Sequence, residues 1–287
     1  MMWTEENRPE QPEKQIPELR TKEQPACFPE GIPFVEIVAP ATLRKGIRTF
    51  TDEEREACIK TWDTYLAGNN RTALFLTHTP AGDAPAGQAL IERLGRVDAD
   101  VVFIGHIGNA LPDPLKRPAP YQKALAGMLV NLQENIFGHL RLIESGSYTQ
   151  EQVEEMIYFL QDELCIKNPE MKYLEDAELI LYIRQQLLRP LRVCGMVRNA
   201  GGPGGSPFLA KSAKDGVVSL QIVAGSQIDP ANPQQQALFE QRAYSGPADM
   251  VCALKGPDGR KYHLPDFADS NSAMSDWNTT LVEAPET

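Results

Sequence analysis

A loop rich in glycine and proline at residues 78–87, HTPAGDAPAG, contains the residues best suited to receive a phosphate. The loop lies between a predicted strand and a predicted helix, where backbone N–H groups and a helix amino-terminus can bind an anion. It contains Gly82 but no lysine or arginine, and its spacing differs from that of a Walker loop. The loop therefore predicts either a phosphate site that includes Gly82 or a plain connection.

A second glycine-rich loop, NAGGPGGSPF, occupies residues 199–208. Its four glycines, which surround a proline, are Gly201, Gly202, Gly204 and Gly205. Glycine lets a ligand approach the backbone closely, so a contact with a sugar or a phosphate is one interpretation of this loop. A wide hairpin loop without a ligand is the other.

Asp276, in the sequence SDWNT before a strand-like run, is the acid that could hold a metal cation at a sheet edge. The alternative is a turn acid that bonds its own backbone. His78 and His106 each follow a predicted strand, which would place both at the carboxyl edge of the sheet. We expect His139 on a helix and His263 in a strand to serve packing or to face solvent. No H-x-x-x-H or G-x-S-x-G motif occurs, so the sequence gives hydrolase chemistry of those kinds no support.

The elements that would position these residues alternate between strand and helix. The strands at 73–77 and 101–105 flank a short helix at 88–94, and this order predicts parallel pairing. A strand at 32–42 precedes a helix that begins with a capping box at Thr51 and Glu54 and ends near Leu66, before Gly68. Ile59, Trp62 and Leu66 are expected on its inner face, and the strand at 73–77 is expected to be buried.

Helical periodicity fills residues 121–189, with helices predicted from residue 121, from the capping pair Thr149 and Gln152, and over 174–188. Strands return at 191–198 and 217–223 and in the run 248–264, which a Pro-Asp-Gly turn interrupts. We therefore predict an α/β fold with a mixed sheet flanked by helices. Residues 1–30 read as a loosely attached arm and residues 31–287 as one domain.

Composition restricts the class of protein. The 287 residues are 42% apolar, which suffices for a sizeable core, and the net charge of −11 argues against a nucleic-acid partner. No leader and no run of 18 apolar residues is visible, so we expect a soluble, cytoplasmic protein without a membrane partner. The five cysteines are scattered without a C-x-x-C spacing and are expected to be reduced thiols.

Several longer strings in the chain resemble, in order, the bacterial family of domains of unknown function numbered 4301. They are GQALIERLGRVDADVVFIGHIGNALPD, YQKALAGMLVNLQENIF, RPLRVCGMVRNAGGPGGSPF, VSLQIVAGSQID and SDWNTTLVE. IPFVEIVAPAT and TDEEREACI also look like the amino-terminal end of that family. The resemblance covers most of the chain beyond the first 30 residues.

That family is in turn similar to uridylyltransferase-type nucleotide-sugar pyrophosphorylases, which join a nucleoside triphosphate to a sugar 1-phosphate on a glycosyltransferase-A-like sheet. The resemblance implies such a fold, a nucleoside triphosphate or sugar phosphate as ligand, and Mg²⁺ or Mn²⁺ as cofactor, with Asp276 matching a late acid-containing turn. It places Gly87 and Asn109 among the substrate-binding residues, beside the glycines of the two loops.

Departures from that pattern bear on activity. Gly108 stands where an acid that binds the metal is expected, and residues 79–84 contain no basic residue to meet a phosphate. A segment between this loop and Gly87 looks missing, as does a tail with a lysine, so the fold is expected to be shortened. These features predict a nucleotidyltransferase-like protein that is weakly active or inactive. The alternative is a non-enzymatic module that binds a nucleotide, a sugar phosphate or another protein.

Overall fold

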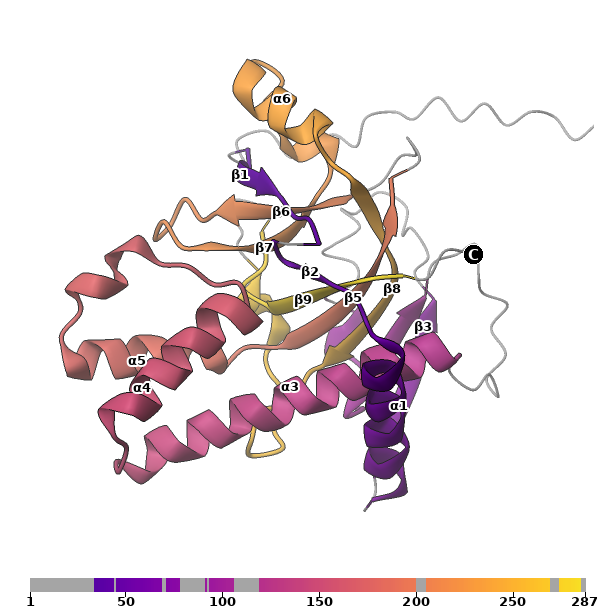
Figure 1. Ribbon diagram of the computed structural model, residues 1–287, viewed down its shortest axis with the longest axis vertical. Helices are drawn as coiled ribbons and strands as arrows, with labels where there is room; N and C mark the ends of the chain where they lie inside the picture. The colour runs from indigo at the N-terminus through magenta and orange to yellow at the C-terminus, as the bar shows by residue number, and fades with distance from the viewer. Residues whose placement is uncertain are drawn as a thin grey trace, which may run out of the picture.

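The computed structural model describes residues 34–43, 45–68, 71–77, 91, 93–105, 119–199, 205–268 and 274–284. Within these ranges the chain forms a six-stranded mixed sheet and a three-stranded antiparallel sheet, both flanked by helices (Figure 1). The α/β fold with a mixed sheet that the sequence predicts is confirmed. The arm predicted at residues 1–30 and most of the helix predicted at 88–94 lie outside the described ranges. No helix in the described ranges is both long and apolar enough to cross a membrane.

The six-stranded sheet has the order β2-β9-β5-β8-β4-β3. Its strands are β2 (Ile47–Arg48), β9 (Asn278–Glu283), β5 (Leu191–Arg198), β8 (Tyr244–Ala253), β4 (Val101–Gly105) and β3 (Ala73–Thr77). β8 runs antiparallel to both of its neighbours, while the pairs β2–β9, β9–β5 and β4–β3 are parallel. All the strands except β8 therefore point the same way, and the predicted parallel pairing of β3 with β4 is confirmed.

The three-stranded sheet contains β1 (Glu36–Pro40), β6 (Ser206–Lys211) and β7 (Val218–Val223). The helix α6 (Pro233–Glu240) lies beside β1, and the side-chain amide of Gln235 bonds both the N–H and the carbonyl of Ile37, at 2.8 and 3.0 Å. β5 and β6 belong to different sheets, so the interpretation of residues 199–208 as a hairpin loop is wrong. That segment crosses from one sheet to the other.

Helices cover the six-stranded sheet as Figure 1 shows, with the long α3 in contact with β5 and β8 and with α1. The α-helices here are α1 (Asp52–Ala67), α3 (Pro120–Ser145), α4 (Gln150–Tyr158) and α5 (Asp176–Leu187). A π-helical turn, η2 (Phe159–Glu163), extends α4, and short 3₁₀ turns occur at η3 (Pro169–Tyr173), η4 (Gly225–Gln227) and η5 (Leu264–Phe267). The capping boxes predicted at Thr51 and Thr149 are both present.

Two burial predictions and one strand prediction need correction. On α1 the buried residues are Cys58 and Trp62, whereas Leu66 is 39% exposed, because the helix rests on α3 along one narrow stripe. β3 is an edge strand, so Leu74 and Phe75 are 42% and 41% exposed rather than buried. His263 does not lie in a strand: it precedes the 3₁₀ turn η5, where its Nδ1 lies 2.9 Å from Asp266. Cys58, Cys165, Cys194 and Cys252 are free thiols, as expected, and Cys27 lies outside the described residues.

Asp100, which directly precedes β4, is a stabilising acid at the start of that strand. It accepts hydrogen bonds from the Thr72 N–H and hydroxyl at 2.9 and 3.1 Å and lies 3.4 Å from the Lys255 ammonium. Burial by itself raises the pKa of the Asp100 carboxyl, but these hydrogen bonds and the nearby charge more than offset it, so the pKa falls below its ordinary value of 3.8.

We expect Asp100→Asn to lower the free energy of unfolding by about 1–2 kcal/mol at pH 7. The native pKa is depressed, so this contribution is complete well above pH 3.8 and is lost as the pH falls through the native pKa. Urea titrations between pH 7 and pH 3 should show wild type and variant converging in acid. Asp98→Asn is the control, because Asp98 is 90% exposed on the other side of Lys255. If the difference in unfolding free energy between wild type and Asp100→Asn grew as the pH fell, the stabilising role of the Asp100 carboxylate would be contradicted.

Candidate functional site

The carboxyl ends of the parallel strands meet at one edge of the six-stranded sheet. β3, β4, β5 and β9 end there at Thr77, Gly105, Arg198 and Glu283. The segments that follow the first three strands contain most of the predicted site residues, namely Gly82, Gly87, Asn109, Gly201, Gly202, Gly204, His78 and His106, together with Gly108. These residues lie outside the described ranges, and the strands that lead into them end at this edge.

Described side chains at this edge form a polar group that we call the edge cluster: Tyr121, Gln122, Arg198, Tyr244, Asp249 and Glu283. Asp249 lies on β8 at its centre, paired with Gly105 of β4 on one side and with Gly195 of β5 on the other. The side-chain amide of Gln122 donates to the Asp249 carboxylate at 2.8 Å. This bond ties the first turn of α3 to the edge of the sheet.

The Tyr121 hydroxyl lies against the backbone of β5. A Cβ atom on Gly195 would come within 2.8 Å of that hydroxyl, so the absence of a side chain there makes room for the tyrosine. Burial raises the pKa of Tyr121, and the negative charges of Asp249 and Glu283 raise it further. The phenol therefore stays protonated near neutral pH and can donate a hydrogen bond, with the Val282 carbonyl 3.5 Å away.

Glu283 supplies the second carboxylate of the edge cluster. Its Oε1 accepts from the Tyr244 hydroxyl and from the Arg198 Nε, both at 3.0 Å, and its side chain is only 17% exposed. Burial raises the pKa of Tyr244, and the hydrogen bond to Glu283 raises it further. The edge thus has two held carboxylates, two protonated phenols and one guanidinium, a set that can bind polar or charged groups.

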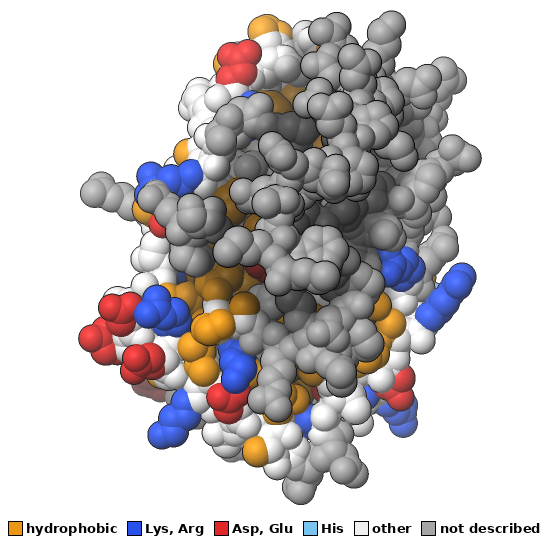
Figure 2. Space-filling model, turned by 90° about the vertical axis from the view of Figure 1, so that its right-hand side faces the viewer, with side chains coloured by type: hydrophobic (Ala, Val, Ile, Leu, Met, Phe, Trp, Pro, Cys, Tyr) orange, Lys and Arg blue, Asp and Glu red, His pale blue; other side chains and the backbone are white. Residues whose placement is uncertain are grey.

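Gly205, the one predicted substrate-binding residue in the described ranges, lies beside this edge. Its carbonyl accepts from the Gly246 N–H at 3.0 Å, close to the start of β8. Figure 2 shows the molecule from the right-hand side of Figure 1, and charged side chains of both signs are visible around the margin of that face. Because the net charge of the chain is −11, a phosphate would depend on local donors rather than on a basic field.

Residues 76–274 match a family described as a domain of unknown function, DUF4301. The protein belongs to the DUF4301 family. No curated protein and no solved structure matches the chain. The resemblance to the DUF4301 family that the sequence predicts is thus confirmed over residues 76–274. The DUF4301 match includes all of the edge cluster except Glu283.

Asp276 lies beyond the DUF4301 match and at the opposite edge of the sheet. β5 pairs with β9 from Leu191 opposite Asn278 to Met196 opposite Glu283, so Asp276 precedes the other end of these strands. At about 3.3 Å per residue, the two edges are roughly 20 Å apart. Asp276 therefore lies outside the edge cluster.

The neighbour of Asp276 is a cation. Its Oδ1 lies 3.8 Å from the Arg189 guanidinium, and the side chain is 46% exposed. No group of three or more His, Cys, Asp or Glu side chains suited to a metal occurs among the described residues. One carboxylate that already faces a guanidinium does not fit a divalent cation. The metal prediction at Asp276 stays a prediction, and a metal titration of the Asp276→Asn variant would test it.

Asp249 is the central acid of this edge, and the sequence interpretation did not single it out. It lies in the run ADMVCA, where an acid directly precedes the apolar core of a strand. This signal would begin a strand after Asp249, whereas β8 begins at Tyr244, and it does not indicate the neighbours of the strand. The pairing of β8 between β4 and β5 is what makes Asp249 central.

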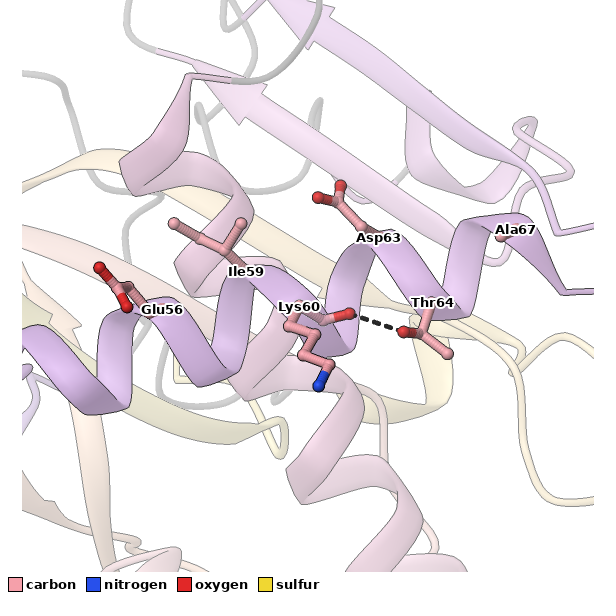
Figure 3. A pocket seen from close by; sticks show the side chains of 6 residues that line it. All are labelled: Glu56, Ile59, Lys60, Asp63, Thr64 and Ala67. Atoms are coloured by element: carbon pink, nitrogen blue, oxygen red, sulfur yellow. Dashed lines mark hydrogen bonds between the residues drawn. The ribbon is translucent and has the colours of Figure 1, made fainter.

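A broad, open hollow of about 550 Å³ along the outer face of α1 is a different feature (Figure 3). Its described lining comes from α1 alone, and two of its polar groups are occupied within the protein. The Thr64 hydroxyl donates to the Lys60 carbonyl, and Asp63 is paired with Lys123, each at 2.8 Å. No residue of the edge cluster lines this hollow, so we assign it no part in the candidate site.

Proposed function

We propose that this DUF4301 protein binds a nucleotide or a sugar phosphate at the carboxyl edge of its parallel strands. We further propose that it is nucleotidyltransferase-like, related to nucleotide-sugar pyrophosphorylases with a glycosyltransferase-A-like sheet, and that it transfers nucleotidyl groups weakly or not at all. The observation that carries the proposal is the convergence of the parallel strand ends, the edge cluster and the first turn of α3. Open α/β sheets bind ligands in the crevice outside such strand ends.

The first turn of α3 supplies donors for a phosphate. The N–H groups at the start of any helix lack intrahelical acceptors. In α3, Pro120 has no N–H and the Ala119 N–H donates to the Gln122 side chain at 3.0 Å. The donors are therefore the N–H groups of Tyr121 and Gln122. The helix dipole adds partial positive charge at this end. Because Gln122 fixes the turn to Asp249, these N–H groups are held beside the strand ends. The proposal rests on this fixed placement, not on the helix alone.

The two carboxylates of the edge cluster decide how the ligand is bound. Asp249 and Glu283 would repel a bare phosphate, so we propose that a nucleotide binds together with a divalent cation that it carries in on its own phosphates. The two acids alone are too few to hold Mg²⁺ or Mn²⁺ firmly without substrate oxygens. Because Gly108 stands in place of the expected acid, we expect the nucleotide to bind with little or no nucleotidyl transfer.

Melting temperatures with ATP, GTP, CTP and UTP, each with and without Mg²⁺ or Mn²⁺, test this proposal. A ligand at about 100 times its dissociation constant adds roughly 2.7 kcal/mol to the folded state. We expect a metal-dependent shift with at least one nucleotide. Asp249→Asn should reduce the shift by half or more, since it removes the charge but keeps an acceptor for Gln122.

Asp276→Asn is the matched control, because it removes the same charge at the opposite edge. We expect the nucleotide-dependent shift in melting temperature to be unchanged in this variant. A shift that vanished in Asp276→Asn and survived in Asp249→Asn would support the metal prediction at Asp276 and contradict ours. No shift with any nucleotide would remove the support for nucleotide binding.

An assay of pyrophosphate release from the nucleotide with a sugar 1-phosphate separates the two forms of the proposal. Slow, metal-dependent release would support a weak nucleotidyltransferase. A thermal shift without any release would favour a non-enzymatic nucleotide- or sugar-phosphate-binding protein that uses the same edge.

A further inference from the structure

A small polar cavity is lined by other residues than those of the edge cluster, although its Arg48 pairs with Val282, the residue before Glu283. It has a volume of about 110 Å³, opens partly to the surface, and is lined by residues of β2, β9, β7 and the end of the π-helical turn η2. Since one water occupies about 30 Å³ in the liquid, the space corresponds to about four waters and suits only a small molecule. None of the edge cluster residues lines it, so a ligand in this cavity is independent of the proposed function.

Arg48 is the cationic group of the cavity. Its hydrogen bonds within the described part of the chain all use Nη2, which contacts the Asp162 and Glu163 carbonyls at 3.4 and 3.1 Å and the Glu163 carboxylate at 2.9 Å. Among the described residues, its Nε and Nη1 have no partner, so donors remain for a ligand. These contacts also fix the guanidinium against the turn η2, which leaves its remaining donors in a defined place.

Thr280 of β9 lines the same cavity. It is 1% exposed, and its hydroxyl has no hydrogen-bond partner within the described part of the chain. Buried hydroxyl groups are nearly always bonded, so an orphaned one beside a cavity indicates a partner that occupies the cavity. That partner can be water or a ligand with a polar group.

The remaining wall is acidic and conformationally unusual. Asp162 and Glu163 end the π-helical turn, and Cys165 has a positive φ of 53°. π-turns and positive-φ residues other than glycine are often found at functional sites. Asp162 and Glu163 provide two carboxylates, of which Glu163 is paired with Arg48. Asp162, which is exposed, is the carboxylate without an ion-pair partner among the described residues.

The Cys165 thiol lies among charges of both signs. Burial raises the pKa of the thiol, Arg48 and Lys167 lower it, and Asp162 and Glu163 raise it. The net effect is an increase, so the thiol is neutral near pH 7. The cavity therefore offers a cation, a carboxylate and a neutral hydroxyl and thiol, rather than a field of one sign.

We propose that this cavity binds a small zwitterion, an α-amino acid with a small side chain. Its carboxylate would accept hydrogen bonds from Arg48 and Thr280, and its ammonium group would face the Asp162 carboxylate. A small anion alone would leave Asp162 unpaired and repelled, and a small amine alone would leave the donors of Arg48 and Thr280 unused. The zwitterion satisfies all three groups within the available volume.

Isothermal titration of the intact protein with glycine, L-alanine and L-serine tests the proposal, with acetate and methylamine as single-charge probes. We expect saturable binding of at least one amino acid, with acetate and methylamine at least about tenfold weaker. Thr280→Val, which keeps the shape of the side chain, and Asp162→Asn should each weaken binding about tenfold, the effect of one lost hydrogen bond or ion contact. Arg55→Gln, on the outer surface of α1, is the control and should leave the affinity unchanged.

Three results would overturn the proposal. No saturable heat from any of the amino acids with folded protein would mean that the cavity holds water only. Acetate or methylamine binding as tightly as the amino acids would mean that one charge suffices. Unchanged affinity in both Thr280→Val and Asp162→Asn would place the amino acid elsewhere.

Discussion

Replacing Gly127 by alanine is expected to lower the free energy of unfolding by about 3 kcal/mol or more. Gly127 lies where α3 crosses α1, and a Cβ atom there would lie 1.8 Å from the Cys58 carbonyl oxygen. The clash is with backbone, so no side-chain rotation relieves it and the two helices must move apart. Urea unfolding followed by circular dichroism measures the effect.

Gly138→Ala is the matched control in the same helix. A Cβ atom at Gly138 meets only the end of the Arg141 side chain, at 3.9 Å. Alanine favours the helix over glycine by about 1 kcal/mol, so this variant should be as stable as wild type or more stable. Equal stability of the two alanine variants would contradict the close crossing of α1 and α3.

Trp62→Ala is expected to cost about 3–5 kcal/mol of unfolding free energy. Trp62 is 0% exposed, and its ring lies edge-on to Phe103 of β4 with 5.3 Å between centroids, and stacks on Tyr65 at 5.9 Å. It therefore joins α1 to the sheet, and alanine would leave a cavity between them. Thermal and urea unfolding by circular dichroism both measure the loss.

Trp62→Phe provides the contrast for that experiment. The indole N–H of Trp62 has no hydrogen-bond partner among the described residues, so phenylalanine removes an unsatisfied donor while it retains most of the ring contacts. We expect a loss of less than about 2 kcal/mol for phenylalanine. If Trp62→Ala and Trp62→Phe lowered the unfolding free energy by the same small amount, the packing of α1 against β4 through Trp62 would be contradicted.

Local features of the fold could be predicted from the sequence because they depend on neighbours along the chain. The Thr51 and Thr149 hydroxyls cap helices through residues three positions away, and the stop at Gly68 is also local. Short apolar runs predict the strands at 73–77 and 101–105, and apolar residues at steps of three and four predict α3. These elements were correctly placed within a few residues.

Pairing between distant strands could not be predicted, and the candidate site depends on it. Nothing local indicates that β8 enters between β4 and β5 and places Asp249 between two glycines. Nor does the loop at 199–208 show that it joins two sheets. The sequence predicts Asp276 at an edge of the sheet but not at which one, and the register of β5 against β9 places it at the edge opposite the edge cluster.

The placement of the ligand at the carboxyl ends of the parallel strands is best tested by hydrogen–deuterium exchange. Exchange is measured with and without the nucleotide that gives the largest thermal shift. With the nucleotide bound, we expect slower exchange at the carboxyl edge, which residues 119–123, 194–199 and 244–250 form. We expect no change at the opposite edge, at residues 186–192 and 275–279. Protection confined to the opposite edge, or no protection anywhere, would contradict the assignment of the ligand site to the carboxyl ends of the parallel strands.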